Sequence, residues 1–319
     1  MNEKHVVLSV IVPCFNEEEA LPLFFREILR VLENEMTLSE YELIFINDGS
    51  RDLTLDIIKS FCEENEHGYY ISFTRNFGKE AAIYAGLRAA RGEYVALMDA
   101  DLQDPPETLC EMYDKLRGGE YDCVATCRTT RVGEPIIRSA FARLFYRLIN
   151  RVSDVEIVDG ARDYRMMTRK MVDDILRLTE YNRFSKGLFQ WVGGKTYWLP
   201  YQNVERVAGS TKWSFRKLFG YAIEGIVNFS DAPLNLVTGM GMMITAASFI
   251  WMLILMAKKI YDAHYNVSGW TSTICVMLFL GGIQLLSIGI IGQYISRIFL
   301  ETKHRPLYLV EEEKLPLNE

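Results

Sequence analysis

The sequence predicts an α/β domain with a mostly parallel sheet, followed by two membrane-spanning helices. Three observations support this prediction. Apolar strand-like runs alternate with helical patterns over residues 6–128, polar clusters follow the ends of those runs, and two long uncharged segments lie near the C-terminus. Alternating strands and helices are typical of a parallel sheet with right-handed crossovers.

The predicted strands are continuous apolar runs, as expected for strands buried on both faces of a parallel sheet. The helices are predicted where apolar residues recur every three or four positions. We expect strands at 6–16, 41–50, 69–76, 93–100 and 121–128, and helices at 20–32, 53–65, 79–91 and 106–118. The stretch "DPPE" predicts the start of the helix at 106–118, with Asp104 as its N-cap and the side chain of Glu107 accepting from the backbone N–H of that cap residue.

The composition narrows the function classes. A net charge of −7 argues against general nucleic-acid binding. Six cysteines without a paired framework favour a reducing cytosol, and four histidines argue against a zinc site. We expect no cleavable signal peptide, because the N-terminal residues lead directly into a strand.

Two segments, Leu234–Ala257 and Val267–Ser296, contain no Asp, Glu, Lys or Arg. Each exceeds the ~20 apolar residues that span a bilayer, and a buried helical hairpin of that length would be unusual. Residues 212–229 mix Trp, Phe and basic side chains with an apolar face, which predicts a helix in the membrane interface. Basic residues flank the ends facing the N-terminal domain more than the hairpin loop, which favours cytoplasmic termini.

Acidic residues follow the strand predicted at 93–100. Asp99 and Asp101 form a D-x-D pair, and two hard oxygen ligands beside a diphosphate would hold Mg²⁺ or Mn²⁺. An isolated D-x-D pair is often only a solvated turn, but its place after a central buried strand favours function. Asp104 has a structural role available and is left out of the metal site.

Polar residues also follow the other strands, at the edge where α/β proteins bind ligands. In "NDGS" at 47–50, Asp48 can accept a hydrogen bond from a base imide, although the same stretch could be a plain turn. Glu17 lies at the neighbouring strand end, near the place of a ribose. Arg75 and Lys79 flank a helix start, which suits a diphosphate, with a solvated basic pair as the alternative.

Four stretches together resemble the family 2 glycosyltransferases with a GT-A fold: "SVIVPCFNEEEALP", "INDGSRDLT", "RNFGKEAAIYAGLRAARGEYVALMDADLQDPPE" and "DGARDYRMMTRK". The chain is most similar to the polyprenyl-phosphate glycosyltransferases, the group of bactoprenol glucosyltransferases and dolichol-phosphate mannose synthases. Residues 292–310 resemble the closing motif of that group. From these patterns and the resemblance together we expect a catalytic domain at 1–210, a juxtamembrane helix at 211–232, a transmembrane hairpin at 233–299 and a cytoplasmic tail at 300–319.

The resemblance also implies roles on the donor side. Asp48 would read uracil, with Pro13 and Glu17 helping at the nucleoside. Asp99 and Asp101 would hold the metal, with Gln103 beside it.

For the acceptor side, Asp163 matches the acid of the family's G-D-F-R motif, a base or a positioning residue. Arg162 stands where Gly is common. Four basic residues would face the lipid phosphate or close over it: Arg128, Arg138, Arg206 and Lys212. Thr211 departs from the family's R-x-x-G-x-S-K loop.

The expected activity is inverting transfer of a sugar, with glucose favoured, from a UDP-sugar to undecaprenyl or another polyprenyl phosphate in the plasma membrane. The alternatives are the same reaction with UDP-N-acetylglucosamine, or a non-catalytic nucleotide-binding membrane scaffold. A processive polysaccharide synthase is disfavoured because Q-x-x-R-W is missing from "FQWVGG". Membrane lipid, a flippase, a downstream transferase and further copies of the chain are the expected partners.

Overall fold

The computed structural model describes residues 6–128, 150, 158, 160–201, 230, 232–261 and 269–316. Within them, eight strands form one sheet in the order β7-β5-β6-β4-β1-β2-β3-β8. The strands are β1 (Leu8–Cys14), β2 (Tyr41–Asn47), β3 (Gly68–Phe73), β4 (Tyr94–Leu97), β5 (Cys123–Arg128), β6 (Ala161–Thr168), β7 (Thr196–Tyr201) and β8 (Val310–Lys314).

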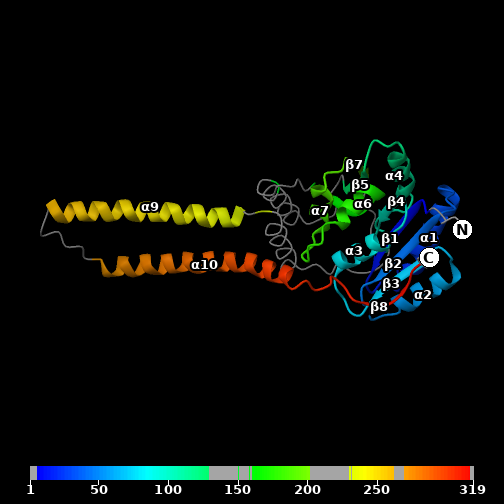
Figure 1. Ribbon diagram of the computed structural model, residues 1–319, viewed down its shortest axis with the longest axis horizontal. Coiled ribbons are helices and arrows are strands. Elements are labelled where there is room, and N and C mark those ends of the chain that lie inside the picture. The colour runs from blue at the N-terminus through cyan, green and yellow to red at the C-terminus, as the bar shows by residue number, and fades with distance from the viewer. Residues whose placement is uncertain are drawn as a thin grey trace.

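The described helices are α1 (Leu21–Leu29), which continues into the π-helical turn η1 (Arg30–Glu35), α2 (Thr54–Glu64), α3 (Lys79–Ala89), α4 (Thr108–Arg117), α6 (Arg169–Leu176), α7 (Ser185–Trp191), α9 (Ala232–Tyr261) and α10 (Trp270–Thr302). Figure 1 shows the α/β domain at one end of the molecule and α9 and α10 projecting from it. The mostly parallel sheet predicted from the sequence is confirmed, because β4, β1, β2 and β3 are parallel neighbours.

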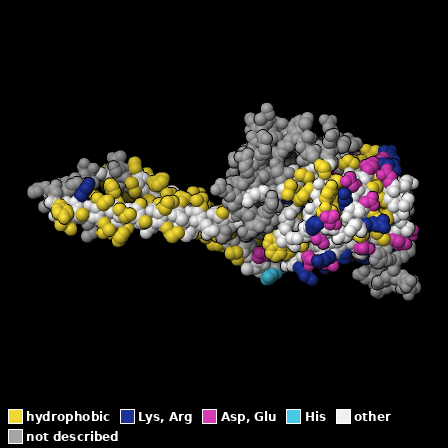
Figure 2. Space-filling model, turned by 90° about the horizontal axis from the view of Figure 1, so that it is seen from above, with side chains coloured by type: hydrophobic (Ala, Val, Ile, Leu, Met, Phe, Trp, Pro, Cys, Tyr) yellow, Lys and Arg dark blue, Asp and Glu magenta, His cyan; other side chains and the backbone are white. Residues whose placement is uncertain are grey.

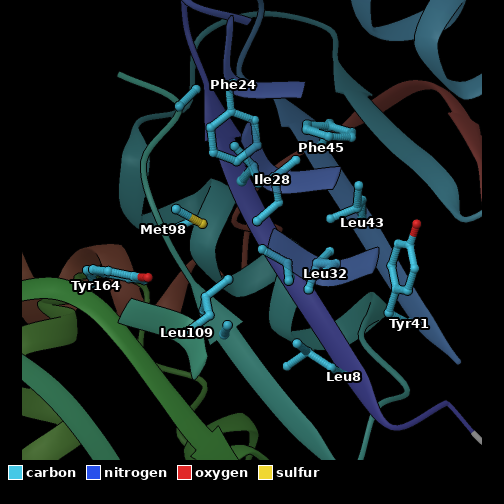
Figure 3. Close-up of a cluster of buried hydrophobic side chains, with 14 of the residues drawn as sticks. Leu8, Phe24, Ile28, Leu32, Tyr41, Leu43, Phe45, Met98, Leu109 and Tyr164 are labelled. Carbon is cyan, nitrogen blue, oxygen red and sulfur yellow. The ribbon is translucent and has the colours of Figure 1, made fainter. Parts of the chain in front are cut away.

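Both faces of the sheet are covered by helices. Side chains alternate along β1, so that Val10 and Val12 pack with α1, α2 and α4 while Ile11 packs with α3, α6 and α7. In the first of these clusters Phe24 of α1 meets Phe45 of β2 edge to face, with ring centroids 6.4 Å apart (Figure 3). Burial on both sides explains why the central strands are continuous apolar runs rather than alternating ones.

Two strands run against the others. β6 is antiparallel to β4 and β5, and β8 is antiparallel to β3 at the edge of the sheet. β8 follows α10 in the chain, and just before it Tyr308 stacks on Phe73 with ring centroids 4.7 Å apart. The tail expected at 300–319 therefore returns to the N-terminal domain, and residues 310–314 complete its sheet. The predicted domain boundaries assign these residues to a tail, whereas the structure pairs them with β3 in the sheet of the N-terminal domain.

The long helices α9 and α10 lie side by side (Figure 1). The segments Ala232–Leu255 and Thr273–Thr302 are long and apolar enough to cross a membrane, close to the two predicted segments. Figure 2 shows hydrophobic side chains along the visible face of this helix pair, whereas most of the charged side chains in view lie on the α/β domain. Trp251 and Leu286 are 63% and 61% exposed. Such extended exposed apolar surfaces mark contacts with membranes or other proteins. The predicted interfacial helix at 212–229 lies outside the described residues.

The turn after β2 gives a first testable prediction. Gly49 has φ +64°, and a Cβ built there would lie 2.3 Å from the carbonyl carbon of Arg75. A side chain in this left-handed conformation costs about 1–2 kcal/mol, and the backbone overlap adds to this cost. We expect Gly49→Ala to destabilise the protein by about 3 kcal/mol or more, measured as a lower thermal unfolding midpoint in detergent.

Gly119→Ala is the matched control for this substitution. Gly119 has φ +68°, but nothing lies within 4 Å of the Cβ built there. It therefore carries the conformational cost without the overlap. An equal effect of the two substitutions would contradict the close approach between the turn and Arg75.

Candidate active site

The candidate site lies at the edge of the sheet where the parallel strands end. Asp99 comes two residues after β4, the strand that pairs with β1. Because β6 runs the opposite way, it begins at this same edge, and its Arg165 pairs with Leu97 at the end of β4. Asp163, two residues earlier on β6, therefore lies beside Asp99. Ligands of α/β sheets bind at this edge.

Lys79 connects these two acids. Its Nζ atom lies 2.7 Å from Oδ1 of Asp99 and 2.8 Å from Oδ2 of Asp163. Lys79 is the first residue of α3 and follows Gly78, whose φ of +99° turns the chain into the helix. We call Lys79, Asp99 and Asp163 the acid–lysine cluster. Its two carboxylates are 33% and 24% exposed, so the cluster is largely buried and still reached by solvent.

Opposite charges fix the protonation states in the acid–lysine cluster. Burial opposes ionisation of Asp163, but the charges of Lys79 and then Lys186 hold its pKa well below the usual value. Burial likewise lowers the pKa of Lys79, yet the charges of Asp163 and Asp99 raise this pKa overall. Both groups are therefore charged at neutral pH. A carboxylate with a lowered pKa is a weak general base.

Asp101 and Gln103 lie in the tight segment that follows β4. The backbone N–H of Gln103 donates to Oδ1 of Asp101 at 3.1 Å. Leu102 between them has φ +54°. A left-handed conformation is uncommon for such a residue, and strain of this kind gathers at functional sites.

The residues at this edge fit a divalent metal. Asp99 and Asp101 offer hard carboxylate oxygens, and Asp99 already binds a cationic group, the ammonium of Lys79. Among the described residues, no group of three or more His, Cys, Asp or Glu side chains could hold a metal ion. Mg²⁺ usually keeps several waters and is bound by one or two carboxylates together with substrate phosphates. The two aspartates therefore suit Mg²⁺ or Mn²⁺ bound together with a diphosphate.

Asp104 is not a helix cap, so the sequence prediction was wrong on this point. α4 begins at Thr108, and Glu107 at the cap position makes no side-chain capping hydrogen bond. Asp104 is buried and accepts from Nη2 of Arg162 at 3.2 Å. The same nitrogen reaches Oε1 of Gln103 at 3.4 Å. A buried carboxylate needs a charged or hydrogen-bonding partner, and Arg162 supplies it by joining β6 to the segment after β4.

Asp48 holds the loop that leads to the acid–lysine cluster. Its Oδ1 atom accepts from the backbone N–H of Phe77 at 2.6 Å, and its Oδ2 atom from that of Gly78 at 2.9 Å. Burial raises the pKa of Asp48 despite these hydrogen bonds. Asp48 therefore helps to place Lys79. The recognition of a nucleotide base by Asp48 stays a prediction.

The other residues predicted for the nucleoside lie at adjacent strand ends. Pro13 of β1 pairs with Ile46 of β2. The backbone N–H of Glu17 donates to Oγ1 of Thr54 at 2.8 Å, which joins the segment after β1 to the start of α2. The structure thus brings Pro13 and Glu17 to the same edge as Asp48, and their contact with a nucleoside stays a prediction.

The residues predicted for the acceptor phosphate are only partly described. Arg128 ends β5 and pairs with Tyr201 of β7. Arg138, Arg206 and Lys212 lie outside the described residues. The acceptor side of the site therefore stays a prediction.

Three ionisable residues near the cluster were not predicted: Glu80, Arg165 and Lys186. Arg165 is 1% exposed, lies 3.8 Å over the ring of Phe189, and donates to the carbonyl oxygen of Asp163 at 3.2 Å. Nζ of Lys186 donates to the carbonyl oxygen of Ala161 at 3.1 Å. These contacts fix the backbone that carries Asp163. A charge inside the apolar run "YRMM" was the available signal for Arg165.

Glu80 gives a second testable prediction, on the pH dependence of stability. Burial raises its pKa from 4.5 to about 7, against hydrogen bonds from Ser185 that lower it. The folded protein thus binds this proton more tightly than the unfolded chain. Its contribution to the unfolding free energy is therefore present below pH 4.5 and is lost as pH rises to about 7. The full loss is at most about 3 kcal/mol.

We expect Glu80→Gln to raise the thermal unfolding midpoint at pH 8 and to change it little at pH 5. Glutamine keeps an oxygen that can accept from Ser185, so the local packing is preserved. Glu63→Gln, an exposed change on α2, is the control and should shift neither midpoint. Equal shifts at both pH values would contradict the assignment.

The comparisons with known proteins agree with this geometry. The family model described as Glycosyl transferase family 2 matches residues 9–176. The chain belongs to this family. It is therefore a glycosyltransferase, and its sheet and covering helices are the GT-A architecture expected from the sequence.

Two relatives match almost the whole glycosyltransferase. The bactoprenol glucosyl transferase of Shigella phage SfV is 40% identical over 307 residues, which cover 96% of this chain and 99% of the relative. A prophage bactoprenol glucosyl transferase homolog of Escherichia coli K12 gives the same identity and coverage. Among solved structures, the mannosyltransferase PcManGT from Pyrobaculum calidifontis is 17% identical with a TM-score of 0.44, covering 93% of this chain and 85% of that one.

Proposed function

We propose that this glycosyltransferase moves glucose from UDP-glucose to a polyprenyl phosphate, undecaprenyl phosphate in bacteria. One observation carries the proposal: the acid–lysine cluster lies in a domain from which two apolar helices of membrane-spanning length project. Such helices would bring a site for a water-soluble sugar nucleotide to an acceptor that stays in the membrane. The relatives named bactoprenol glucosyl transferase support a lipid acceptor and glucose.

The proposed reaction needs no strong base. A phosphate monoester has a second pKa near 6, so at neutral pH the acceptor is largely a dianion. One of its oxygens forms a bond to the anomeric carbon while the bond from that carbon to the diphosphate oxygen breaks. UDP leaves, and the α-linked donor gives a β-linked product. The protein mainly has to orient the two substrates and stabilise charge.

The residues of the site match these needs. Lys79 is charged and would stabilise the negative diphosphate, and Asp163 would position Lys79 and the acceptor rather than act as a base. Asp48, with Pro13 and Glu17, would bind the nucleoside. The acceptor phosphate would be held by the basic residues predicted for it, Arg128, Arg138, Arg206 and Lys212, because guanidinium groups match phosphate oxygens.

Asp99 and Asp101 would hold Mg²⁺ or Mn²⁺, with Gln103 beside the ion. A bound ion would offset the negative charge of the departing diphosphate. Asp99 and Asp163 also hold the ammonium of Lys79 between them, and this residue would supply further positive charge to the diphosphate.

The proposed location is the plasma membrane, with the catalytic domain and both termini in the cytoplasm. The excess of basic residues at the domain end of the hairpin supports this orientation. The product would then be a lipid-linked sugar on the cytoplasmic side. Its use outside the cell requires a flippase and a second transferase, and we expect the chain to act as a homo-oligomer.

The test is transfer of label from a panel of UDP- and GDP-sugars to organic-extractable lipid. It uses the purified full chain, undecaprenyl phosphate and Mg²⁺ or Mn²⁺, with EDTA as a control. Label from UDP-glucose that EDTA abolishes is the expected result. Label from UDP-N-acetylglucosamine alone would show that N-acetylglucosamine, and not glucose, is the transferred sugar. A folded protein that binds UDP but labels no lipid would favour the scaffold alternative.

A further inference from the structure

The end of α10 is hydrogen-bonded to a segment that leads to the candidate active site. Oε1 of Glu301 accepts from the backbone N–H of Tyr181 at 2.7 Å. One turn earlier on α10, Nη1 of Arg297 donates to Oδ1 of Asn182 at 2.6 Å. In both contacts the two partners are more than 110 positions apart in the sequence. One partner in each contact lies on α10, which is long and apolar enough to cross a membrane.

The segment that receives these contacts lies between α6 and α7 and forms no regular helix or strand from 178 to 184. Its position therefore depends on side-chain contacts rather than on a repeating backbone pattern. Arg183 is 9% exposed, and its guanidinium lies 4.5 Å over the ring of Tyr84 on α3. The segment is thus held between α10 on one side and α3 on the other.

Ser185 and Lys186, the first two residues of α7, contact the elements that carry the acid–lysine cluster. The backbone N–H of Ser185 donates to Oε2 of Glu80 at 2.9 Å, and its hydroxyl donates to the same oxygen. Nζ of Lys186 donates to the carbonyl oxygen of Ala161, two residues before Asp163. Glu80 directly follows Lys79 at the start of α3. Residues 181–186 therefore contact α10 at one end and both elements of the cluster at the other.

We propose that Arg297 and Glu301 are positioning residues of the active site, which act through residues 181–186 on Lys79 and Asp163. In this arrangement the membrane hairpin does more than anchor the enzyme, because its last turns help to set the geometry of the donor site. A misplacement of about 1 Å in a catalytic group can cost about 100-fold in rate, so small shifts of this segment would matter. The inference rests on the proposed function for its kinetic readout.

The first test compares Glu301→Ala with wild type in vesicles that contain undecaprenyl phosphate, using labelled UDP-glucose. We expect kcat to fall about tenfold while the KM for UDP-glucose changes less than about twofold, because the contacts of residues 181–186 described above involve Glu80 and Ala161 and not Asp48, Pro13 or Glu17. Rates are expressed per UDP-binding site, which removes any effect of unfolded protein. Glu301→Gln keeps an acceptor oxygen for Tyr181 and should recover most of the rate. Glu311→Ala, an exposed change in β8, is the control.

The second test measures amide hydrogen exchange in the same proteins, without any acceptor or donor. We expect Glu301→Ala and Arg297→Ala to speed exchange at residues 181–186 and also at the starts of α3 and β6. Faster exchange confined to 178–186 would overturn the proposal, as would an unchanged kcat for Glu301→Ala. If wild type transfers no sugar, the proposed function fails, and the exchange result alone decides whether α10 positions the cluster.

Discussion

Replacing Asp101 by Asn is expected to lower kcat for sugar transfer by about 1,000-fold or more, and Asp99→Asn should have a similar effect. Each change removes one negative charge and one strong oxygen ligand while keeping the size of the side chain. Asp101 makes a local contact with the N–H of Gln103, which an Asn oxygen can also accept. For Asp101→Asn the loss should therefore be chemical rather than structural.

The measurement is label transfer to undecaprenyl phosphate over a range of Mg²⁺ and Mn²⁺ concentrations. The variants should need more metal for half-maximal UDP binding, observed by calorimetry. Asp114→Asn, an exposed change on α4, serves as the control and should behave as wild type. Transfer by Asp101→Asn within about tenfold of wild type would exclude the aspartate pair as a metal site.

Asp163→Asn is expected to lower kcat by about 100-fold, because Lys79 loses one of its two anionic partners and shifts toward Asp99. The pH profile separates a positioning role from a base. The charge of Lys79 holds the pKa of Asp163 well below its ordinary value. Asp163 is therefore already ionised across the working range, and the acidic limb of the wild-type profile should follow the acceptor phosphate near pH 6.

The variant should keep the shape of that profile while its maximum falls. A profile in which Asp163→Asn loses the acidic limb would show instead that Asp163 acts as the base. The stability of the variant gives an independent check. The depressed pKa of Asp163 stabilises the folded state above its unfolded pKa near 4, and this contribution is lost as pH falls below it. Asp163→Asn should therefore destabilise the protein at pH 7 and have little effect at the acidic end.

Local patterns predicted most of the elements because they reflect burial on both faces of a parallel sheet. The segments that form β1 and β2 are mostly apolar along their whole length, so they were recognised as buried strands without an alternating pattern. The helices beside them carry apolar residues at helical spacing. Boundaries were less certain. The stretch "DPPE" has the chemistry of a helix start, yet α4 begins at Thr108, and Asp104 pairs instead with Arg162 from the distant strand β6.

The sequence by itself determined the α/β class, the two apolar helices and the polar residues at the strand ends, since each depends on neighbours in the chain. Only the tertiary structure decided how those residues meet. The reversed direction of β6 brings Asp163 to Asp99, and Lys79 bridges them from the start of α3. The contacts of Arg297 and Glu301 with residues 181–182, and the return of β8 to the sheet, also join distant parts of the chain. Charge pairing and strand pairing across such distances have no periodicity in the sequence, so no local pattern could have predicted them.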